Sequence, residues 1–336
     1  MVILVLVTAV ASAALDNVTT VLLVAPVTVL LCERLELDPI PFLIAEVLAS
    51  NIGGTATLIG DPPNIIIASR AGLSFNDFVV NLAPLVLVLL AVLVVACRLM
   101  FRSALTYHPE RVAEIMEMDE REAIRDPKLL WQSVAVLALT MVAFVLHTAL
   151  HLEPSIVALL GAGLLVLVSR VKIETALHEV EWPTLVFFMG LFVTVGGLIE
   201  AGVIGRLADA AADATGGDLL GGSLLLLGVS GALSGIVDNI PYVATMSPVV
   251  AELVADADQG GADPNVLWWA LALGSDLGGN ATAVGASANV VVLGIAERSG
   301  HRISFWRFTR YGIIVAALTI SLSVPYVWLR YFVIGS

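Results

Sequence analysis

Long apolar segments separated by short polar stretches run through most of the chain. An uninterrupted apolar run predicts a membrane-crossing helix, because a helix needs about 20 apolar residues to span the hydrocarbon core. The pattern places such helices at residues 76–99, 128–150, 154–169, 183–200 and 311–332. It therefore predicts an all-α polytopic membrane protein.

Two further apolar regions, residues 1–32 and 219–255, are each divided into two arms by a short polar tip. The tips are Asp16-Asn17 and Asp238-Asn239. Each arm is too short to cross a bilayer comfortably. We therefore expect each region to form a re-entrant hairpin.

Residues 39–70 and 264–297 are also apolar, but glycine, proline and small polar residues interrupt them. Unwound backbone at membrane depth is tolerated only where it is buried in protein or lines a wet cavity. Interrupted spans at matching positions of two halves point to the binding site of a transporter. The alternative is a pair of kinked scaffold helices whose small residues allow close packing.

The two interruptions are copies of each other, since Asn51–Asn64 reads NIGGTATLIGDPPN and Asp276–Asn289 reads DLGGNATAVGASAN. In register, the identical residues are Gly53, Gly54, Ala56, Thr57, Gly60 and Asn64 in the first copy and Gly278, Gly279, Ala281, Thr282, Gly285 and Asn289 in the second. The hairpin tips match as well. The chain is therefore an internal duplication.

The duplication divides the chain at residues 101–127. Repeat 1 covers residues 1–100, with hairpin 1–32, broken helix 39–70 and helix 76–99. Repeat 2 covers residues 128–336, with scaffold helices in 128–200, hairpin 219–255, broken helix 264–297 and helix 311–332. Repeat 1 has no counterpart of the scaffold helices, so symmetry predicts that it is N-terminally incomplete.

Basic residues concentrate around the segment between the repeats, at Arg98, Arg102, Arg111, Arg121, Arg125 and Lys128. The positive-inside rule makes 101–127 a cytoplasmic loop. Counting spans from that loop puts residues 256–264 outside and gives the two repeats opposite orientations. Inverted repeats are the arrangement of many alternating-access carriers.

Polar groups in the tips and breaks are the candidate substrate- or ion-binding residues, because amides and hydroxyls can coordinate a cation or bind a hydroxylated substrate. In repeat 1 they are Asp16, Asn17, Thr19, Asn51, Gly53, Gly54, Thr55, Thr57, Asp61 and Asn64. In repeat 2 they are Asp238, Asn239, Asp276, Gly278, Gly279, Asn280, Thr282 and Asn289.

The carboxylates among them lie in breaks that hold no lysine or arginine, and Glu46 precedes the first break. Such groups bind a cation or take up protons, so Na⁺ or H⁺ is the expected coupling ion. A possible Na⁺ site comprises Asp16, Asn17, Asp238 and Asn239. The alternative is that the aspartates cap half-helices, since Asp is a preferred N-cap. That alternative is stronger for Asp61, beside two prolines, than for the duplicated tip carboxylates.

Composition excludes several classes of protein. The 336 residues are 59% hydrophobic and 13% charged, about half the charge fraction of a soluble domain. The net charge of −13 comes mostly from loops, and no basic stripe suggests a nucleic-acid partner. Cys32 and Cys97 form no disulfide framework. No histidine or cysteine joins the aspartate breaks, so we expect neither an enzyme nor a cofactor other than the coupling ion.

Five segments carry a resemblance to a known family: LDNVTTVLLVAPVT (15–28), NIGGTATLIGDPPN (51–64), EVEWPTLVFFMGLF (179–192), VDNIPYVATMSPVV (237–250) and LGGNATAVGASANVVV (277–292). They resemble the ion transporter superfamily, in the branch of arsenite permeases, NhaD-type Na⁺/H⁺ antiporters and melanosomal P proteins, with a citrate-transporter-like domain. The resemblance implies a scaffold part and a transport part, usually in a homodimer, as a multi-pass protein of the plasma membrane.

The combined hypothesis is a secondary carrier that moves an inorganic ion by Na⁺/H⁺ antiport or by arsenite or antimonite efflux. The lack of cysteine in the breaks favours Na⁺/H⁺ exchange, although hydroxyl and amide groups could carry neutral arsenite. A Na⁺-coupled carrier of di- or tricarboxylates is the alternative. Relatives that transport dicarboxylates have Ser-Asn-Thr at the tips, whereas the tips here begin with Asp16 and Asp238, and these carboxylates would repel an anion. A passive channel and an intramembrane enzyme are the remaining rivals.

Overall fold

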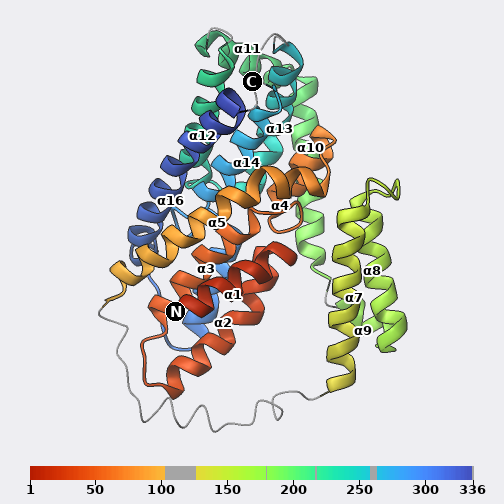
Figure 1. Ribbon diagram of the computed structural model, residues 1–336, viewed down its shortest axis with the longest axis vertical. Coiled ribbons are helices and arrows are strands. Elements are labelled where there is room, and N and C mark those ends of the chain that lie inside the picture. The colour runs from red at the N-terminus through yellow and green to blue at the C-terminus, as the bar shows by residue number, and fades with distance from the viewer. Residues whose placement is uncertain (103–125, 179, 216–217, 258–262, 335–336) are drawn as a thin grey trace. The chain divides into compact units, whose positions relative to one another are not determined.

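All regular elements that the computed structural model describes, in residues 1–102, 126–178, 180–215, 218–257 and 263–334, are helices (Figure 1). This confirms the all-α prediction. Within the described part of the chain, five helices are long and apolar enough to cross a membrane: α2 (Asn17–Arg34), α5 (Phe75–Met100), α7 (Pro127–Leu146), α10 (Trp182–Glu200) and α16 with its extension (Phe305–Ile334). Most of the predicted cytoplasmic loop 101–127, and most of the loop 256–264, lies outside the described residues.

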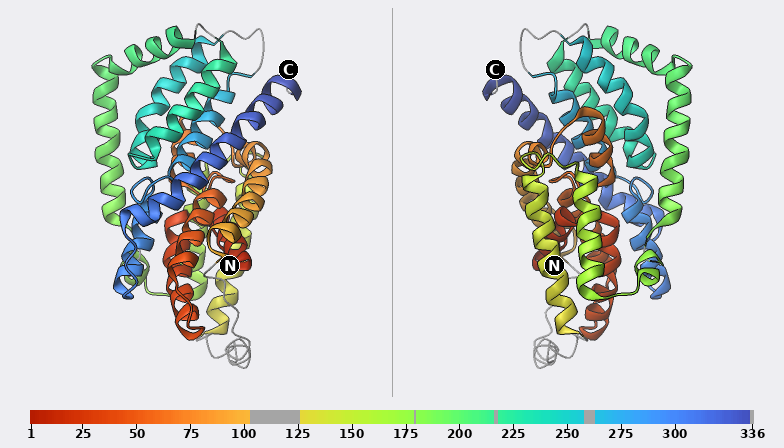
Figure 2. Two further views of the ribbon diagram at one scale, coloured as in Figure 1. Left: turned by 90° about the vertical axis from the view of Figure 1, so that its left-hand side faces the viewer. Right: turned by 90° about the vertical axis from the view of Figure 1, so that its right-hand side faces the viewer.

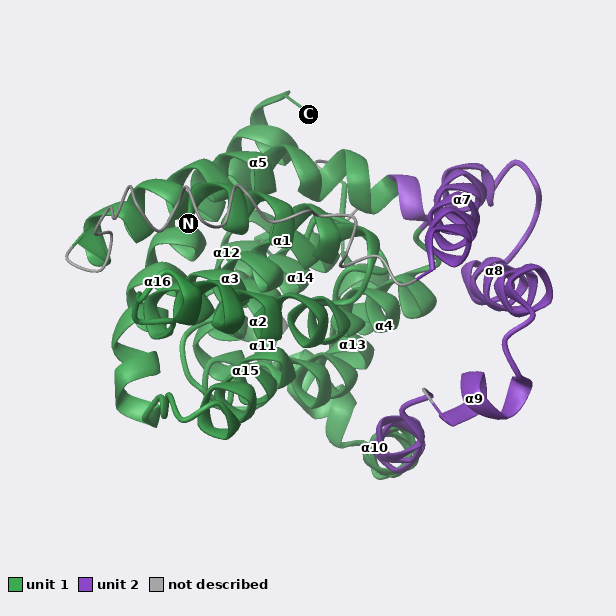
Figure 3. Cartoon of the chain, turned by 90° about the horizontal axis from the view of Figure 1, so that it is seen from below, with its two compact units in different colours: residues 1–73, 77–107, 192–336 green, residues 74–76, 108–191 purple. Residues whose placement is uncertain are grey.

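The chain divides into two compact units, which Figure 3 shows in different colours. Unit 1 comprises residues 1–73, 77–107 and 192–336, and unit 2 comprises residues 74–76 and 108–191. Unit 1 holds every candidate site residue.

Two pairs of antiparallel partners organise unit 1. Hairpin 1 consists of α1 (Val2–Ala14) and α2 (Asn17–Arg34), and hairpin 2 consists of α12 (Leu219–Ser234) and α13 (Asn239–Asp256). Helix α1 lies along α3 (Ile40–Gly54), and α12 lies along α14 (Val266–Gly278), as Figures 1 and 2 show. Each hairpin therefore packs on the helix that follows it in its own repeat.

The second half of each broken span packs on the hairpin of the other repeat. Helix α4 (Pro62–Ala71) lies against α13, and α15 (Ser287–Arg298) lies against α2. The two repeats thus interlock by a reciprocal exchange of these short helices. This exchange brings the polar residues of both breaks and both tips into one core.

Helix α16 (Phe305–Trp328) begins earlier than the hydrophobic pattern predicted, at Phe305 rather than at residue 311. The side chain of Ser304 accepts a hydrogen bond from the Arg307 backbone N–H at 3.2 Å and caps its first turn. Arg307 and Arg310 shorten the apolar run at its start, but they do not shorten the helix, because the cap residue and not side-chain polarity sets where the helix begins. A π-helix (Leu329–Ile334) extends α16, and α11 (Val203–Thr215) is the remaining helix of unit 1.

Unit 2 is built on the antiparallel pair α7 (Pro127–Leu146) and α8 (Pro154–Ser169). The Gln132 side-chain amide donates to the carbonyl of Val168 at 3.3 Å, which joins the start of α7 to the end of α8. Gly161 of α8 lies directly against Thr140 of α7, where a larger residue would overlap the threonine side chain. The short helix α9 (Ile173–His178) and the first part of α10 complete this unit.

Candidate functional site

Each broken span contains two short helices joined by an irregular segment. Helix α3 ends at Gly54 and α4 begins at Pro62, while α14 ends at Gly278 and α15 begins at Ser287. Proline fits the first turn of a helix, where its missing N–H would have no intrahelical partner. The Pro62-Pro63 pair therefore suits the start of α4, whereas α3 has already ended at Gly54.

Threonine and asparagine side chains hold the two irregular segments in the same way. The Thr57 hydroxyl donates to the Ala13 carbonyl at 2.7 Å, and the Thr282 hydroxyl donates to the Gly235 carbonyl at 2.6 Å. The Asn64 amide donates to the Thr57 carbonyl at 3.0 Å, and the Asn289 amide donates to the Thr282 carbonyl at 2.8 Å. These side chains donate hydrogen bonds to backbone carbonyls of the unwound segments and helix ends. Such carbonyls have no intrahelical partner and no lipid group to bond to inside a membrane.

The paired glycines serve close packing. A Cβ atom on Gly53 would overlap the backbone of Ala9, and one on Gly278 would overlap the backbone of Gly231. Gly54 and Gly279 similarly face the backbones of Gly60 and Gly285 within their own breaks. These four glycines, which the sequence placed among the candidate ligands, shape the backbone of the breaks and carry no side chain to a solute.

The side chain of Asn51 is the centre of an amide cluster formed by Asn17, Asn51, Asn280 and Asn289. Its carbonyl oxygen accepts from the Asn17 amide at 3.2 Å, and its amide lies 3.0 Å from the oxygens of both Asn280 and Asn289. All four side chains are buried. The cluster joins the tip of hairpin 1 to both broken spans.

Two carboxylates lie buried beside this cluster. Asp61 is 1% exposed and accepts hydrogen bonds from the Asn239 amide at 3.3 and 3.4 Å, which joins the tip of hairpin 2 to the first break. Asp276 is fully buried, and the side chains of Thr55 and Asn64 lie beside it. The Asp276 carboxylate is close enough to Asp61 to act on its charge. No lysine or arginine is among the described buried residues, so no buried basic side chain neutralises these carboxylates.

Several polar atoms around the cluster have no hydrogen-bond partner among the described residues. They are Oδ2 of Asp276, Oδ1 of Asn64 and Nδ2 of Asn280. A buried polar group without a partner costs free energy, and a bound ion or hydroxylated solute would supply the missing partners. Two of the three free atoms are oxygens, which suits a hard cation.

The tip carboxylates form helix caps, which is the alternative that the sequence left open, while their part in ion binding stays a prediction. Asp16 caps α2, since it accepts from the Thr19 backbone N–H at 2.8 Å and from the Thr19 hydroxyl. Asp238 caps α13 through the Ile240 backbone N–H at 3.0 Å, and its other oxygen accepts from Ser287 at 2.8 Å. Both aspartates are half-buried. They hold the hairpin tips, whereas their neighbours Asn17 and Asn239 face the core.

For Asp61 the capping alternative is wrong. Asp61 occupies the position before α4, but its side chain makes no capping hydrogen bond. The two prolines explain this, because Pro62 and Pro63 have no N–H to donate to a cap. The carboxylate is instead free to turn toward Asn239.

The remaining candidates bond within the breaks. Thr55 donates to the carbonyl of Asn51 at 3.0 Å, which closes the end of α3. Sequence reasoning missed Ser287, which binds Asp238, and the serines that tie each hairpin to its own broken span. A small hydroxyl residue at matched positions of both repeats was the available signal.

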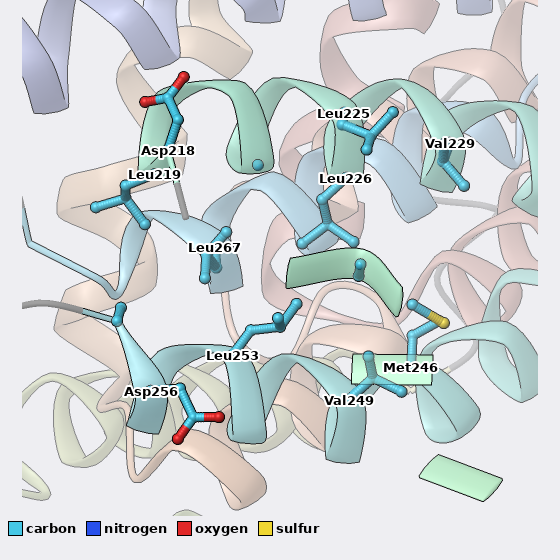
Figure 4. Close-up of a pocket in the computed structure, with 13 residues that line it drawn as sticks. Asp218, Leu219, Leu225, Leu226, Val229, Met246, Val249, Leu253, Asp256 and Leu267 are labelled. Atoms are coloured by element: carbon cyan, nitrogen blue, oxygen red, sulfur yellow. The ribbon is translucent and has the colours of Figure 1, made fainter. Parts of the chain in front are cut away.

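One cavity has a lining that includes none of these polar groups. It has a volume of about 300 Å³, and Figure 4 shows that leucine, valine and methionine side chains line most of it. Asp218 and Asp256 are its acidic lining residues, and Leu226, Met246 and Leu253 are among the apolar ones. None of its lining residues belongs to the candidate set.

Comparison with known proteins places this chain among transporters. Residues 1–274 match the family described as CitMHS, citrate transporter. An uncharacterized transporter of Mycobacterium tuberculosis is 58% identical over 334 residues, covering 99% of this chain and 77% of the relative. The 46 kDa membrane protein of Mycobacterium leprae is 57% identical over 333 residues, covering 99% of this chain and 77% of the relative. The human P protein is 33% identical over 407 residues, covering 98% of this chain and 48% of that protein.

Proposed function

The chain belongs to the CitMHS citrate-transporter family, and from that premise we propose that this secondary transporter moves a small inorganic cation, with Na⁺ exchanged for H⁺ as the leading possibility. The binding centre comprises the amide cluster with Asp61 and Asp276. Efflux of arsenite or antimonite as neutral hydroxides is the other inorganic possibility, because amides can hold hydroxyl groups without thiols.

The convergence of both tips and both breaks on one buried, acidic centre carries this proposal. Asn17 and Asn239 reach the centre from the two hairpins, and Asn51, Asp61 and Asp276 reach it from the broken spans. The centre contains carboxylates without a buried basic partner. A cation offsets this charge, whereas an anion without a cation would increase the repulsion.

We further propose that the two repeats, residues 1–100 and 128–336, lie in opposite orientations across the bilayer. The matched hydrogen bonds of the two breaks and the reciprocal packing of α4 and α15 support this pseudo-symmetry. Alternating access would then proceed by movement of one set of elements past the other around a fixed centre. Impermeant thiol reagents should reach cysteines placed at Arg102 and Asp256 from opposite sides, in a chain with Cys32 and Cys97 replaced by alanine.

A carrier of a citrate-like organic anion is the second candidate, and the description of the matched family favours it. The first turns of α4 and α15 offer positive dipole ends that could face carboxylates. The buried Asp61 and Asp276 would oppose a bare anion. This candidate therefore requires the anion to enter with a cation.

Counterflow in proteoliposomes tests the proposal. Purified protein is reconstituted, the vesicles are loaded with one unlabelled solute, and uptake of its radioactive form is measured for sodium, arsenite and citrate in turn. We expect sodium counterflow in the wild type and none in protein-free vesicles. Citrate counterflow without sodium dependence would overturn the cation proposal and support the second candidate.

A further inference from the structure

The carboxyl group of Glu46 is the most deeply buried acid outside the proposed binding centre. Glu46 lies in α3 and is fully buried. The Thr28 hydroxyl of α2 donates to its Oε2 at 2.7 Å. Its other oxygen, Oε1, has no partner among the described residues. A buried charge with a single neutral donor is costly, so this environment suits the protonated acid.

Packing alone does not require an acid at this position. In the alignment of the two breaks, Leu271 of α14 corresponds to Glu46, and Leu271 is fully buried as well. In the alignment of the two hairpins, Val250 corresponds to Thr28. The second repeat thus has two buried apolar side chains at the positions where the first repeat has the polar pair of Thr28 and Glu46.

The groups around Glu46 leave it without a compensating charge. Helix α1 carries no titratable side chain, α2 contributes the buried Cys32 thiol, and α14 contributes Asp276. Among the described titratable residues of the other helices packed on α3, Tyr311 and Tyr326 are half-buried and the exposed ones are Glu297, Arg298, Arg307 and Arg310. The exposed Glu33 and Arg34 end α2.

Glu46 also lies nearer to one end of the hairpin than the binding centre does. Its partner Thr28 precedes the end of α2 at Arg34 by six residues, or about 9 Å along a helix at 1.5 Å per residue. Asn17, which belongs to the amide cluster, lies at the opposite end of the same helix. The Arg34 end of α2 therefore lies close to Glu46 along the helix, on the side away from the centre.

We propose that Glu46 is a proton-binding site of the transport cycle, separate from the cation-binding centre. Its part in the transport cycle rests on the proposed function. Uptake forms an O–H bond at Oε1 from a proton supplied by water, and Thr28 continues to donate to Oε2. Release returns the proton to water and leaves a carboxylate. The site changes its charge by one unit without any change at Asp61 or Asp276.

Infrared difference spectroscopy tests the site without any solute. The full chain, reconstituted in phosphatidylcholine vesicles, is titrated with pH while the C=O stretching band of protonated carboxylic acids is followed. We expect a component that disappears with rising pH in the wild type and is missing in Glu46→Gln. Glu153→Gln is the matched control, because Glu153 is exposed and its side chain caps no helix, and this variant should keep the component that Glu46→Gln loses.

Two further variants guard against a trivial loss. Glu46→Leu copies the second repeat and should fold while lacking the same component. Thr28→Val removes a donor that stabilises the ionised form, so the component should persist with its midpoint at higher pH. An unchanged band in Glu46→Gln or Glu46→Leu would overturn the proposal, and so would an unchanged midpoint in Thr28→Val.

Transport is measured separately, as sodium flux driven by a pH gradient. Loss of the band in Glu46→Gln together with absence of flux in the wild type would keep the proton site and reject the proposed function. Flux in the wild type together with an unchanged band in Glu46→Gln would support the proposed function and reject the proton site. With both proposals correct, Glu46→Gln should still exchange sodium but lose its acceleration by the pH gradient.

Discussion

The hairpin and broken span of repeat 1 and those of repeat 2 share a backbone framework but differ in where their charges lie. Ser12 donates to the carbonyl of Ser50 at 2.7 Å, and its counterpart Ser234 donates to the carbonyl of Ser275 at 2.6 Å. Gly53 and Gly278 meet the opposing helix at equivalent points. Both repeats therefore use equivalent hydrogen bonds and close contacts to pack unwound backbone inside a membrane.

The buried carboxylates show no such correspondence. Asp61 of the first break aligns with Ala286, and Asp276 of the second break aligns with Asn51. Each break thus contributes one buried carboxylate from a different position. Two symmetric pairs would place four like charges in one core, at a high electrostatic cost. The comparison teaches that duplication preserved the framework while each repeat acquired its own chemistry.

A hydroxyl pair in the hairpins shows the same divergence. In hairpin 2 the Tyr242 hydroxyl donates to Ser230 at 3.0 Å. The aligned residues of hairpin 1 are Thr20 and Thr8, whose buried hydroxyls have no partner among the described residues. A tyrosine ring therefore fills in one hairpin the position that a much smaller side chain occupies in the other.

Removing the buried carboxylates should have the largest effect on transport, because these are the positions at which the two repeats differ in charge. Asp61→Asn and Asp276→Asn should each reduce sodium counterflow about 10- to 100-fold, because a hydrogen bond to a charged group contributes ~1.5–3 kcal/mol. Asp16→Asn and Asp238→Asn should have smaller effects, since Asn is also a good N-cap. Counterflow at matched expression checks the order, and equal loss in all four variants would contradict it.

Adding a methyl group to the paired glycines should destabilise both repeats alike. Gly53→Ala and Gly278→Ala would each force the opposing helix away, at a cost of about 1–3 kcal/mol for overpacking. Gly228→Ala is the control, because its Cβ would meet no atom within 4 Å and alanine favours a helix. Thermal unfolding in detergent measures the effect. Stability of Gly53→Ala equal to the control would contradict the contact.

Truncating the central amide should weaken the junction between the repeats. Asn51→Ala removes hydrogen bonds with Asn17, Asn280 and Asn289, and at about 0.6 kcal/mol for each interhelical bond in a membrane the loss should be ~2 kcal/mol. Asn265→Ala, outside the cluster, should change little, since its side chain caps no helix. Thermal unfolding again provides the measurement, and equal stability of the two variants would remove Asn51 from its central place.

The smallest expected effects test the symmetry itself. Ser12→Ala and Ser234→Ala should each lower stability by about 0.6 kcal/mol, the average of such bonds in membranes. Equal losses would support an equivalent framework in both repeats. A loss confined to one serine would show that the two hairpins are anchored differently.

The sequence by itself determined the helical class, the duplication and the approximate position of each break, because these follow from local hydrophobicity and from glycine and proline. It also identified the asparagines of the amide cluster as polar residues in apolar spans. It favoured a capping role for Asp61 over one for the tip aspartates, and this order is wrong, since a cap depends on which N–H groups lie within reach, and Pro62 and Pro63 offer none.

Only the tertiary structure decided which of these groups meet. Asn51 contacts Asn280 and Asn289 across more than two hundred residues, and no local pattern encodes such a pairing. The reciprocal packing of α4 on α13 and α15 on α2 creates the centre. Burial then separates the capping carboxylates at Asp16 and Asp238 from the core carboxylates at Asp61 and Asp276, because the cost of a charge depends on the surroundings that the folded chain places around it.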